Sequence, residues 1–253
     1  MFIYCMLLGF INFLAFSQDL EHAGGGRFLK RVEHNLLLNV LYNLDSKGDV
    51  EKLLLGDFNA RVEFFYAPSH DGASAFRVVR DSLNKSWCLE IKHVSNYVEA
   101  QKISSYNNPS IGIPANLMSS LPNDIRHLIK VHNNNITDKY FEEMHKLFKV
   151  ETHSFPISDQ FMEKLYGKMV SLIENIKAIG LPEVCFGGYS VSFRTVVDIE
   201  VWSLNVQMPQ GNALKMSNLC RQIITDAMAN EFDEAKYISV LDSFENYRQE
   251  KLP

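Results

Sequence analysis

Residues 187–209, GGYSVSFRTVVDIEVWSLNVQMP, carry the clearest secondary-structure signal in the chain. Apolar and polar side chains alternate through two runs, which is typical of strands with one buried face. The apolar positions are Val191, Phe193, Thr195 and Val197 in the first run, and Trp202, Leu204, Val206 and Met208 in the second. The pattern predicts a β-hairpin in which Val197 pairs with Trp202. A loop over 198–201 or a turn at 199–200 gives the same register, and a one-residue slip would expose one apolar set.

Upstream of this hairpin, residues 59–94 show the same period of two. The first run alternates apolar positions with charged ones, and the turn cluster PSHDG at 68–72 separates it from runs at 76–81 and 87–94. This arrangement predicts a three-stranded antiparallel meander. Phe65 faces away from its two aromatic neighbours. It either contacts a carbohydrate or protein on an open sheet face or, more commonly, lies under a helix.

Two segments show the 3.6-residue period of amphipathic helices. Ser158 or Asp159 is a good N-cap for the first, and Gly180 with Pro182 ends it. Its apolar stripe consists of Met162, Leu165, Met169, Leu172, Ile173 and Ile176. The second helix follows residues 211–212, and its inward stripe consists of Met216, Cys220, Ile223 and Ala227.

Weaker helical patterns lie elsewhere in the chain. Helices are predicted over residues 29–44 and 233–248, and two shorter ones over 124–131 and 139–148. Residues 104–136 are otherwise weakly patterned and rich in Asn, Pro and Ser, with NNN at 133–135 as a helix breaker.

Strands and helices therefore follow one another in blocks. This predicts an α+β fold in which an antiparallel β-meander and a β-hairpin pack with amphipathic helices. The chain has 253 residues, 46% of them hydrophobic, so it can bury a large core. We expect residues 18–253 to form a single α+β domain, with a two-lobed split near 104–136 as the alternative. The net charge of −5 argues against nucleic-acid binding.

Residues 1–18, MFIYCMLLGFINFLAFSQ, contain no charged side chain. Ala15 and Ser17 occupy positions −3 and −1 of a cut before Gln18, so residues 1–17 are interpreted as a secretory signal peptide. A positively charged start is missing, and an uncleaved anchor or a core helix are the alternatives. We expect an exported protein, periplasmic or at the cell surface, with no membrane span after processing.

The sequence lacks the motifs G-x-G-x-x-G, P-loop, H-E-x-x-H, G-x-S-x-G and C-x-x-C, so we expect no cofactor and no metal. Beyond the signal peptide there are three cysteines, Cys88, Cys185 and Cys220, which allow at most one internal disulfide. His127 and His132 are five residues apart, which is unsuitable for a zinc pair on a helix. The charged run 142–145 is interpreted as a solvated helix face.

Four residues are the candidates for catalysis. His70 and Asp71 lie in the 68–72 cluster, whose composition is ordinary turn chemistry. Cys88 has no base nearby, because His93 falls on the opposite face of its predicted strand. His153 could approach it only through the tertiary fold. We therefore expect none of the four to be catalytic.

Several segments of the second half resemble a group of uncharacterised exported proteins of Gram-negative gut bacteria. The segments are FPISD at 155–159, GYSVSFRTVV at 188–197, Trp202, and MPQGNALKMSNLCRQII at 208–224, together with residues 62–97. The resemblance implies export and a bacterial source. Because those proteins have no assigned activity, it implies no catalytic residue.

The leading hypothesis is a non-catalytic binding or interaction module for an unknown protein or carbohydrate ligand. The alternative is a hydrolase whose site is assembled from distant segments, with His70, Asp71, Cys88 and His153 as its residues. A third hypothesis is a subunit that uses an apolar face for self-association.

Overall fold

The computed structural model describes residues 21–23, 27–31, 48–56, 60–81, 85–178, 188–197, 200–244 and 250–252. The predicted signal peptide and Cys185 lie outside the described residues. The chain divides into two compact units. We name them the sheet unit, for residues 1–69, 73–92 and 152–253, and the helical unit, for residues 70–72 and 93–151.

The predicted α+β fold is confirmed. Eight strands form one sheet in the order β1-β2-β9-β8-β3-β4-β5-β6. Their bounds are Glu21–Ala23 (β1), Arg27–Arg31 (β2), Val62–Pro68 (β3), Ser74–Arg80 (β4), Trp87–Val94 (β5), Val150–Ile157 (β6), Tyr189–Val197 (β8) and Glu200–Gln207 (β9). Two short strands, β7 (Ile176–Ala178) and β10 (Glu250–Leu252), pair in parallel apart from this sheet. The meander β3–β4–β5 and the hairpin β8–β9 share one sheet because β8 pairs antiparallel with β3.

The predicted register of the hairpin is wrong by two residues. Trp202 pairs with Thr195, and Val197 pairs with Glu200, at the start of β9. The apolar residues nevertheless stay on one face, because a slip of two residues preserves the side-chain alternation of a strand. Trp202 packs half-buried against the core instead of lying fully inside it.

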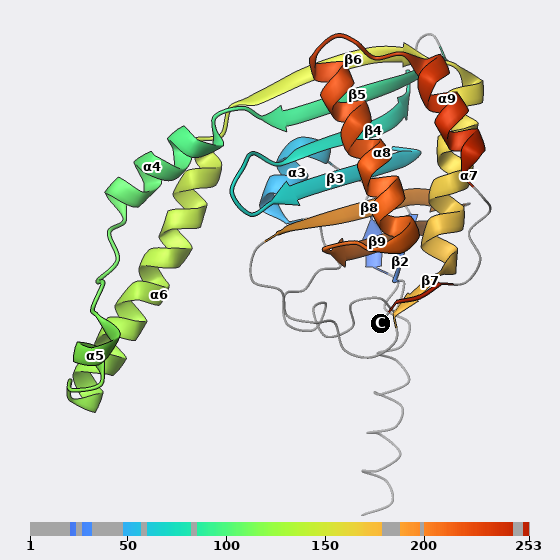
Figure 1. The fold of residues 1–253 in the computed structure, drawn as a ribbon. Helices are drawn as coiled ribbons and strands as arrows, with labels where there is room; N and C mark the ends of the chain where they lie inside the picture. Colours follow the sequence, from blue (N-terminus) through green and yellow to red (C-terminus); the bar gives the residue numbers. More distant parts are fainter. Residues whose placement is uncertain are drawn as a thin grey trace, which may run out of the picture. The chain divides into compact units, whose positions relative to one another are not determined.

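One face of the sheet carries the main core. Figure 1 shows α7 (Asp159–Asn175) and α8 (Gly211–Met228) over this face, and α9 (Glu234–Ser243) beside α7. The predicted stripes of both long helices are buried, except that Ile176 begins β7. Ser158 caps α7, since its Oγ accepts a hydrogen bond from the Phe161 amide at 3.1 Å.

The other face of the sheet carries α3 (Asp49–Leu55). Arg77 Nη1, on β4, donates to the Leu55 carbonyl at 3.0 Å, and Arg194, on β8, pairs with Glu51. Phe65 lies on this face with an exposed fraction of 9%, which contradicts an open aromatic contact surface there.

Two predicted helices differ from the structure. Residues 29–31 belong to β2, which pairs in parallel with β9, and residues 32–44 of the predicted helix lie outside the described residues. The last helix, predicted over 233–248, ends at Ser243. Strand pairing with β9 overrides the helical spacing at the first of these sites, since periodicity is only a local signal.

The helical unit contains α4 (Tyr97–Asn107), α5 (Ala115–Met118) and α6 (Asn123–Lys146). The prediction of two short helices over 124–131 and 139–148 is wrong, because α6 continues through residues 133–135. Asn133 has a tertiary role: its side chain accepts from the Ile111 amide at 2.9 Å and donates to the Ile111 carbonyl at 3.0 Å. Across the described part of the chain, no helix combines the length and the apolar character that crossing a bilayer requires.

Candidate functional site

The turn at 68–72 has a structural role. Asp71 Oδ1 accepts a hydrogen bond from the Gly72 amide at 2.7 Å, and both His70 and Asp71 are exposed. A Cβ on Gly72 would lie 1.9 Å from the Val94 carbonyl oxygen, so only glycine fits the close approach of the two backbones. The interpretation of these residues as turn chemistry agrees with this geometry.

Cys88 and His153 lie on opposite faces of the sheet. Cys88 alternates with the core residues Leu89 and Ile91, whereas His153 has the same strand parity as the core residue Ile157. Burial raises the pKa of the Cys88 thiol, and the nearby Glu90 carboxylate raises it further. The thiol is therefore protonated at neutral pH, and the structure does not bring His153 to it as a base.

His70 and Asp71 belong to the helical unit and Cys88 and His153 to the sheet unit. The other polar runs considered from the sequence have separate structural roles. Glu142 pairs with Lys146 at 2.6 Å one helical turn away, and Glu143 accepts from the Asn108 side chain at 2.7 Å. Among the described residues, no group of three His, Cys, Asp or Glu side chains could hold a metal ion.

Two polar clusters missed by the sequence analysis hold helices in place. In the first, Arg194 is 4% exposed and contacts Glu51, with Glu63 Oε2 at 4.0 Å. Burial acts to lower the pKa of Arg194, but the Glu51 and Glu63 carboxylates together outweigh it, so the pKa is raised and the guanidinium stays charged. A hollow beside this pair, lined also by Val201, has no room for a water molecule. The cluster anchors α3 rather than forming a ligand pocket.

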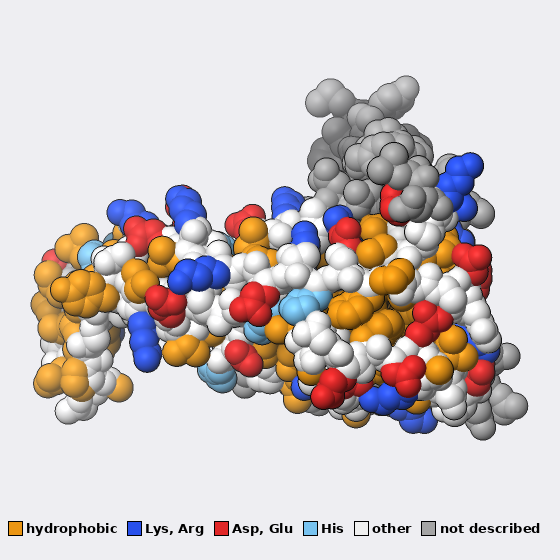
Figure 2. Space-filling view, turned by 90° about the horizontal axis from the view of Figure 1, so that it is seen from above, with side chains coloured by type: hydrophobic (Ala, Val, Ile, Leu, Met, Phe, Trp, Pro, Cys, Tyr) orange, Lys and Arg blue, Asp and Glu red, His pale blue; other side chains and the backbone are white. Residues whose placement is uncertain are grey.

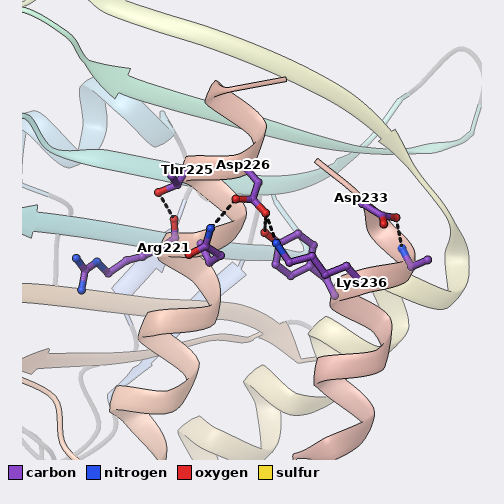
Figure 3. A network of polar contacts seen from close by, with 8 residues as sticks. Arg221, Thr225, Asp226, Asp233 and Lys236 are labelled. Carbon is purple, nitrogen blue, oxygen red and sulfur yellow. Dashed lines mark hydrogen bonds and ion pairs between the residues drawn. The ribbon is translucent and has the colours of Figure 1, made fainter. Parts of the chain in front are cut away.

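The second cluster joins α8 to α9 around Asp226 (Figure 3). The Asp226 carboxylate accepts hydrogen bonds from Gln222, Lys236 and Tyr237, each at 2.5 Å. The hydrogen bond from Lys236, followed by that from Tyr237, lowers the pKa of Asp226. A carboxylate held by three donors is a poor general base, so this network is structural.

The helical unit differs from the sheet unit in its surface. Among the described residues, all large hydrophobic side chains that are exposed belong to the helical unit, apart from Leu53 and Met208. The cause is a thin interior: α6 has 24 residues, of which only Ile129 and Met144 are buried. Polar contacts hold α4 to α6 instead, such as the 2.6 Å hydrogen bond from Ser104 Oγ to the Tyr140 carbonyl.

Five of these exposed side chains lie on or near α5 and the first half of α6. We name this set the tip surface; it consists of Ile111, Leu117, Ile125, Leu128 and Val131. Leu128 is 62% exposed and Leu117 is 54% exposed. Figure 2 shows hydrophobic side chains gathered at the end of the helical unit that holds α5. An exposed apolar cluster of this kind is typical of an interaction site.

The charges around the tip surface are unlike those of the whole chain. Residues 109–134 contain one carboxylate, Asp124, and two permanent cations, Arg126 and Lys130, all exposed. His127 and His132 are exposed on the same half of α6. This segment therefore carries a net charge of +1, two cations less one carboxylate, in a chain of net charge −5.

Sequence reasoning missed the tip surface because it treated 104–136 as weakly patterned. A usable signal was present: aliphatic residues recur through a segment rich in Asn, Pro and Ser that was assigned to no core element. Apolar residues that no core position explains are candidates for a surface contact.

Comparison of the chain with protein families, curated proteins and solved structures finds no match. The resemblance to exported proteins of gut bacteria therefore stays a prediction.

Proposed function

We propose that the protein is an exported, non-catalytic binding module that contacts its partner through the tip surface. The observation that carries this proposal is the exposure of five aliphatic side chains at one end of the helical unit. Exposed apolar area costs free energy in water, and burial against a partner recovers it. The apolar segment 1–17 supports the periplasm or the cell surface as the place of action.

The hydrolase alternative has less support. A nucleophile needs a base within hydrogen-bond reach, and Cys88 and His153 lie on opposite faces of one sheet. The tip surface itself offers no such pair, because its side chains are aliphatic. They also suit a sugar poorly as a ligand, since they provide neither an aromatic face nor hydrogen-bonding groups.

A photo-cross-linking amino acid placed at position 128 tests the proposal in cells that make the protein. The matched control carries the same amino acid at position 53, because Leu53 is also an exposed leucine on a helix but lies in the sheet unit. We expect a cross-linked adduct of defined mass from position 128 and none from position 53. Equal labelling at both positions, or no adduct at either, would contradict the proposal.

A further inference from the structure

The tip surface lies far along α6 from the place where the chain leaves the helical unit. The chain enters the main part of the helical unit at His93 and leaves it at Glu151, just after the C-terminal end of α6. In contrast, α5 precedes the N-terminal end of α6. A helix of 24 residues is about 36 Å long at 1.5 Å per residue. The first turns of this helix contain Ile125, Leu128 and Val131. A flat partner can therefore contact these side chains at the N-terminal end of α6.

The side chains of the tip surface are those of a lipid contact rather than of a protein interface. All five are Ile, Leu or Val. Central positions of protein interfaces favour Tyr, Trp and Arg, and Leu and Val are under-represented among the residues that dominate binding energy. The exposed aromatic residues of this unit, Tyr106 and Phe141, lie outside the tip surface. Aliphatic side chains need no specific geometry to enter the acyl region of a bilayer.

The charges next to the tip surface favour an anionic partner. Arg126 and Lys130 are exposed beside Ile125 and Leu128, and Asp124 is the only carboxylate in residues 109–134. Cations flanking an apolar face attract anionic headgroups while the apolar side chains enter the interface. The remainder of the chain has a net negative charge, so it adds no general attraction to an anionic surface.

A second copy of the chain fits these charges less well. A two-fold contact places the same surface on both sides, so Arg126 and Lys130 of each copy would face a surface carrying the same excess of cations. Like charges across an interface oppose binding. We propose that the tip surface binds an anionic lipid bilayer, an inference that rests on the proposed function and names its partner.

Vesicle binding of the full 253-residue chain tests this inference. Sedimentation with phosphatidylcholine vesicles that contain phosphatidylglycerol is compared with sedimentation with phosphatidylcholine alone. One variant combines Leu117→Gln with Leu128→Gln, and a second combines Arg126→Gln with Lys130→Gln. The control combines Lys102→Gln with Lys139→Gln, which removes two exposed cations of the same unit outside residues 109–134. Residues 1–17 are present in every sample and contain no charged side chain, so they do not account for a preference for anionic vesicles or for a difference between variants.

We expect the wild type to prefer the anionic vesicles and to lose binding as salt is raised. Each tip variant should bind these vesicles at least about tenfold more weakly than the wild type, and the control should stay within about twofold. All six substituted positions are exposed, and circular dichroism verifies that each variant is folded.

Three outcomes would overturn the inference. Equal binding by all variants would mean that another segment contacts the lipid. Equal loss in the control would mean that total charge, not the tip surface, is responsible. Absence of vesicle binding by the wild type would exclude the lipid partner. In that last case, a cross-link from position 128 to a protein would leave the proposed function standing, whereas no cross-link would remove both.

Discussion

Tyr237 donates its hydroxyl to the Asp226 carboxylate across the contact between α9 and α8, with 2.5 Å between the two oxygens. Tyr237 is 1% exposed, so its hydroxyl has no water to replace this acceptor. Burial of the ring, and then the Asp226 hydrogen bond, raise the pKa of Tyr237. The pair therefore joins two helices of the core at a point where an unmatched polar group is costly.

Asp226→Asn should lower the free energy of unfolding by about 1–3 kcal/mol at neutral pH, because it weakens charge-assisted hydrogen bonds. The folded-state pKa of Asp226 is lowered, so its contribution is present above the ordinary carboxyl range and is lost as the pH falls through the folded pKa. Urea denaturation of both proteins at neutral and acid pH measures this effect. A gap between wild type and variant that is the same at every pH would contradict it.

Tyr237→Phe is the matched control for this prediction. It keeps the buried ring and removes one of the three donors to Asp226. We expect a loss of about 1 kcal/mol, the usual contribution of a single hydrogen bond. A loss as large as that of the Asp226 variant would mean that the hydroxyl, not the carboxylate, is the centre of the network.

Gly72→Ala should destabilise the protein, since the new Cβ would lie 1.9 Å from the Val94 carbonyl oxygen and the backbone must shift. Overpacking of this kind costs about 1–3 kcal/mol or more. Gly167→Ala is the control, because it lies within α7 and a Cβ there meets nothing within 4 Å. That variant should gain up to about 1 kcal/mol from helix propensity. Thermal melting that moves both variants in the same direction would contradict the close contact between the backbones of Gly72 and Val94.

Phe193→Ala should cost about 3–5 kcal/mol, the usual effect of removing a large core aromatic side chain. Phe193 is fully buried, and its ring packs against Phe64 with 5.3 Å between centroids. Trp202→Ala should cost less, because Trp202 is only half-buried. Chemical denaturation ranks the two variants. The opposite order would support the register predicted from sequence, in which Trp202 is the more central residue.

None of the residues considered for catalysis should matter for turnover. We expect wild type, Cys88→Ser, His70→Ala and His153→Ala to behave alike in a screen against ester, peptide and glycoside substrates. The reason is the raised thiol pKa together with the separation of Cys88 from His153 by the sheet. Turnover by the wild type that disappears in any one variant would support the hydrolase alternative instead.

Export should remove residues 1–17 and leave Gln18 as the first residue, because Ala15 and Ser17 fit the cleavage positions. The intact mass of the protein recovered from the periplasm or medium of a Gram-negative host measures this. A mass that retains residues 1–17 would favour the anchor.

The local periods in the sequence were enough to locate the main elements. The two-residue period locates the strands β5, β8 and β9, and the 3.6-residue period locates the helices α7 and α8. Burial on one side of an element requires apolar residues at that element's own period, so the sequence shows it directly. The inward residues of these elements, such as Leu165 and Ile223, could be named from the same patterns.

The sequence patterns do not indicate which strand residues pair with one another. A slip of two residues keeps Phe193 and Leu204 on the core face, so alternation alone cannot distinguish the observed register from the predicted one. The parallel contact of β2 with β9 joins segments that are far apart in the sequence, such as Phe28 and Glu200, and likewise follows only from tertiary packing.

The helical unit is the clearest case of dependence on tertiary structure. α6 buries two residues and is held by side-chain hydrogen bonds from Asn108, Asn133 and Ser104, whose residue types otherwise indicate breaks and turns. Those bonds form only when α4 and the residues that follow it lie against α6. The tip surface arises from the same cause, since a helix pair held by polar contacts leaves its aliphatic side chains without a core to enter.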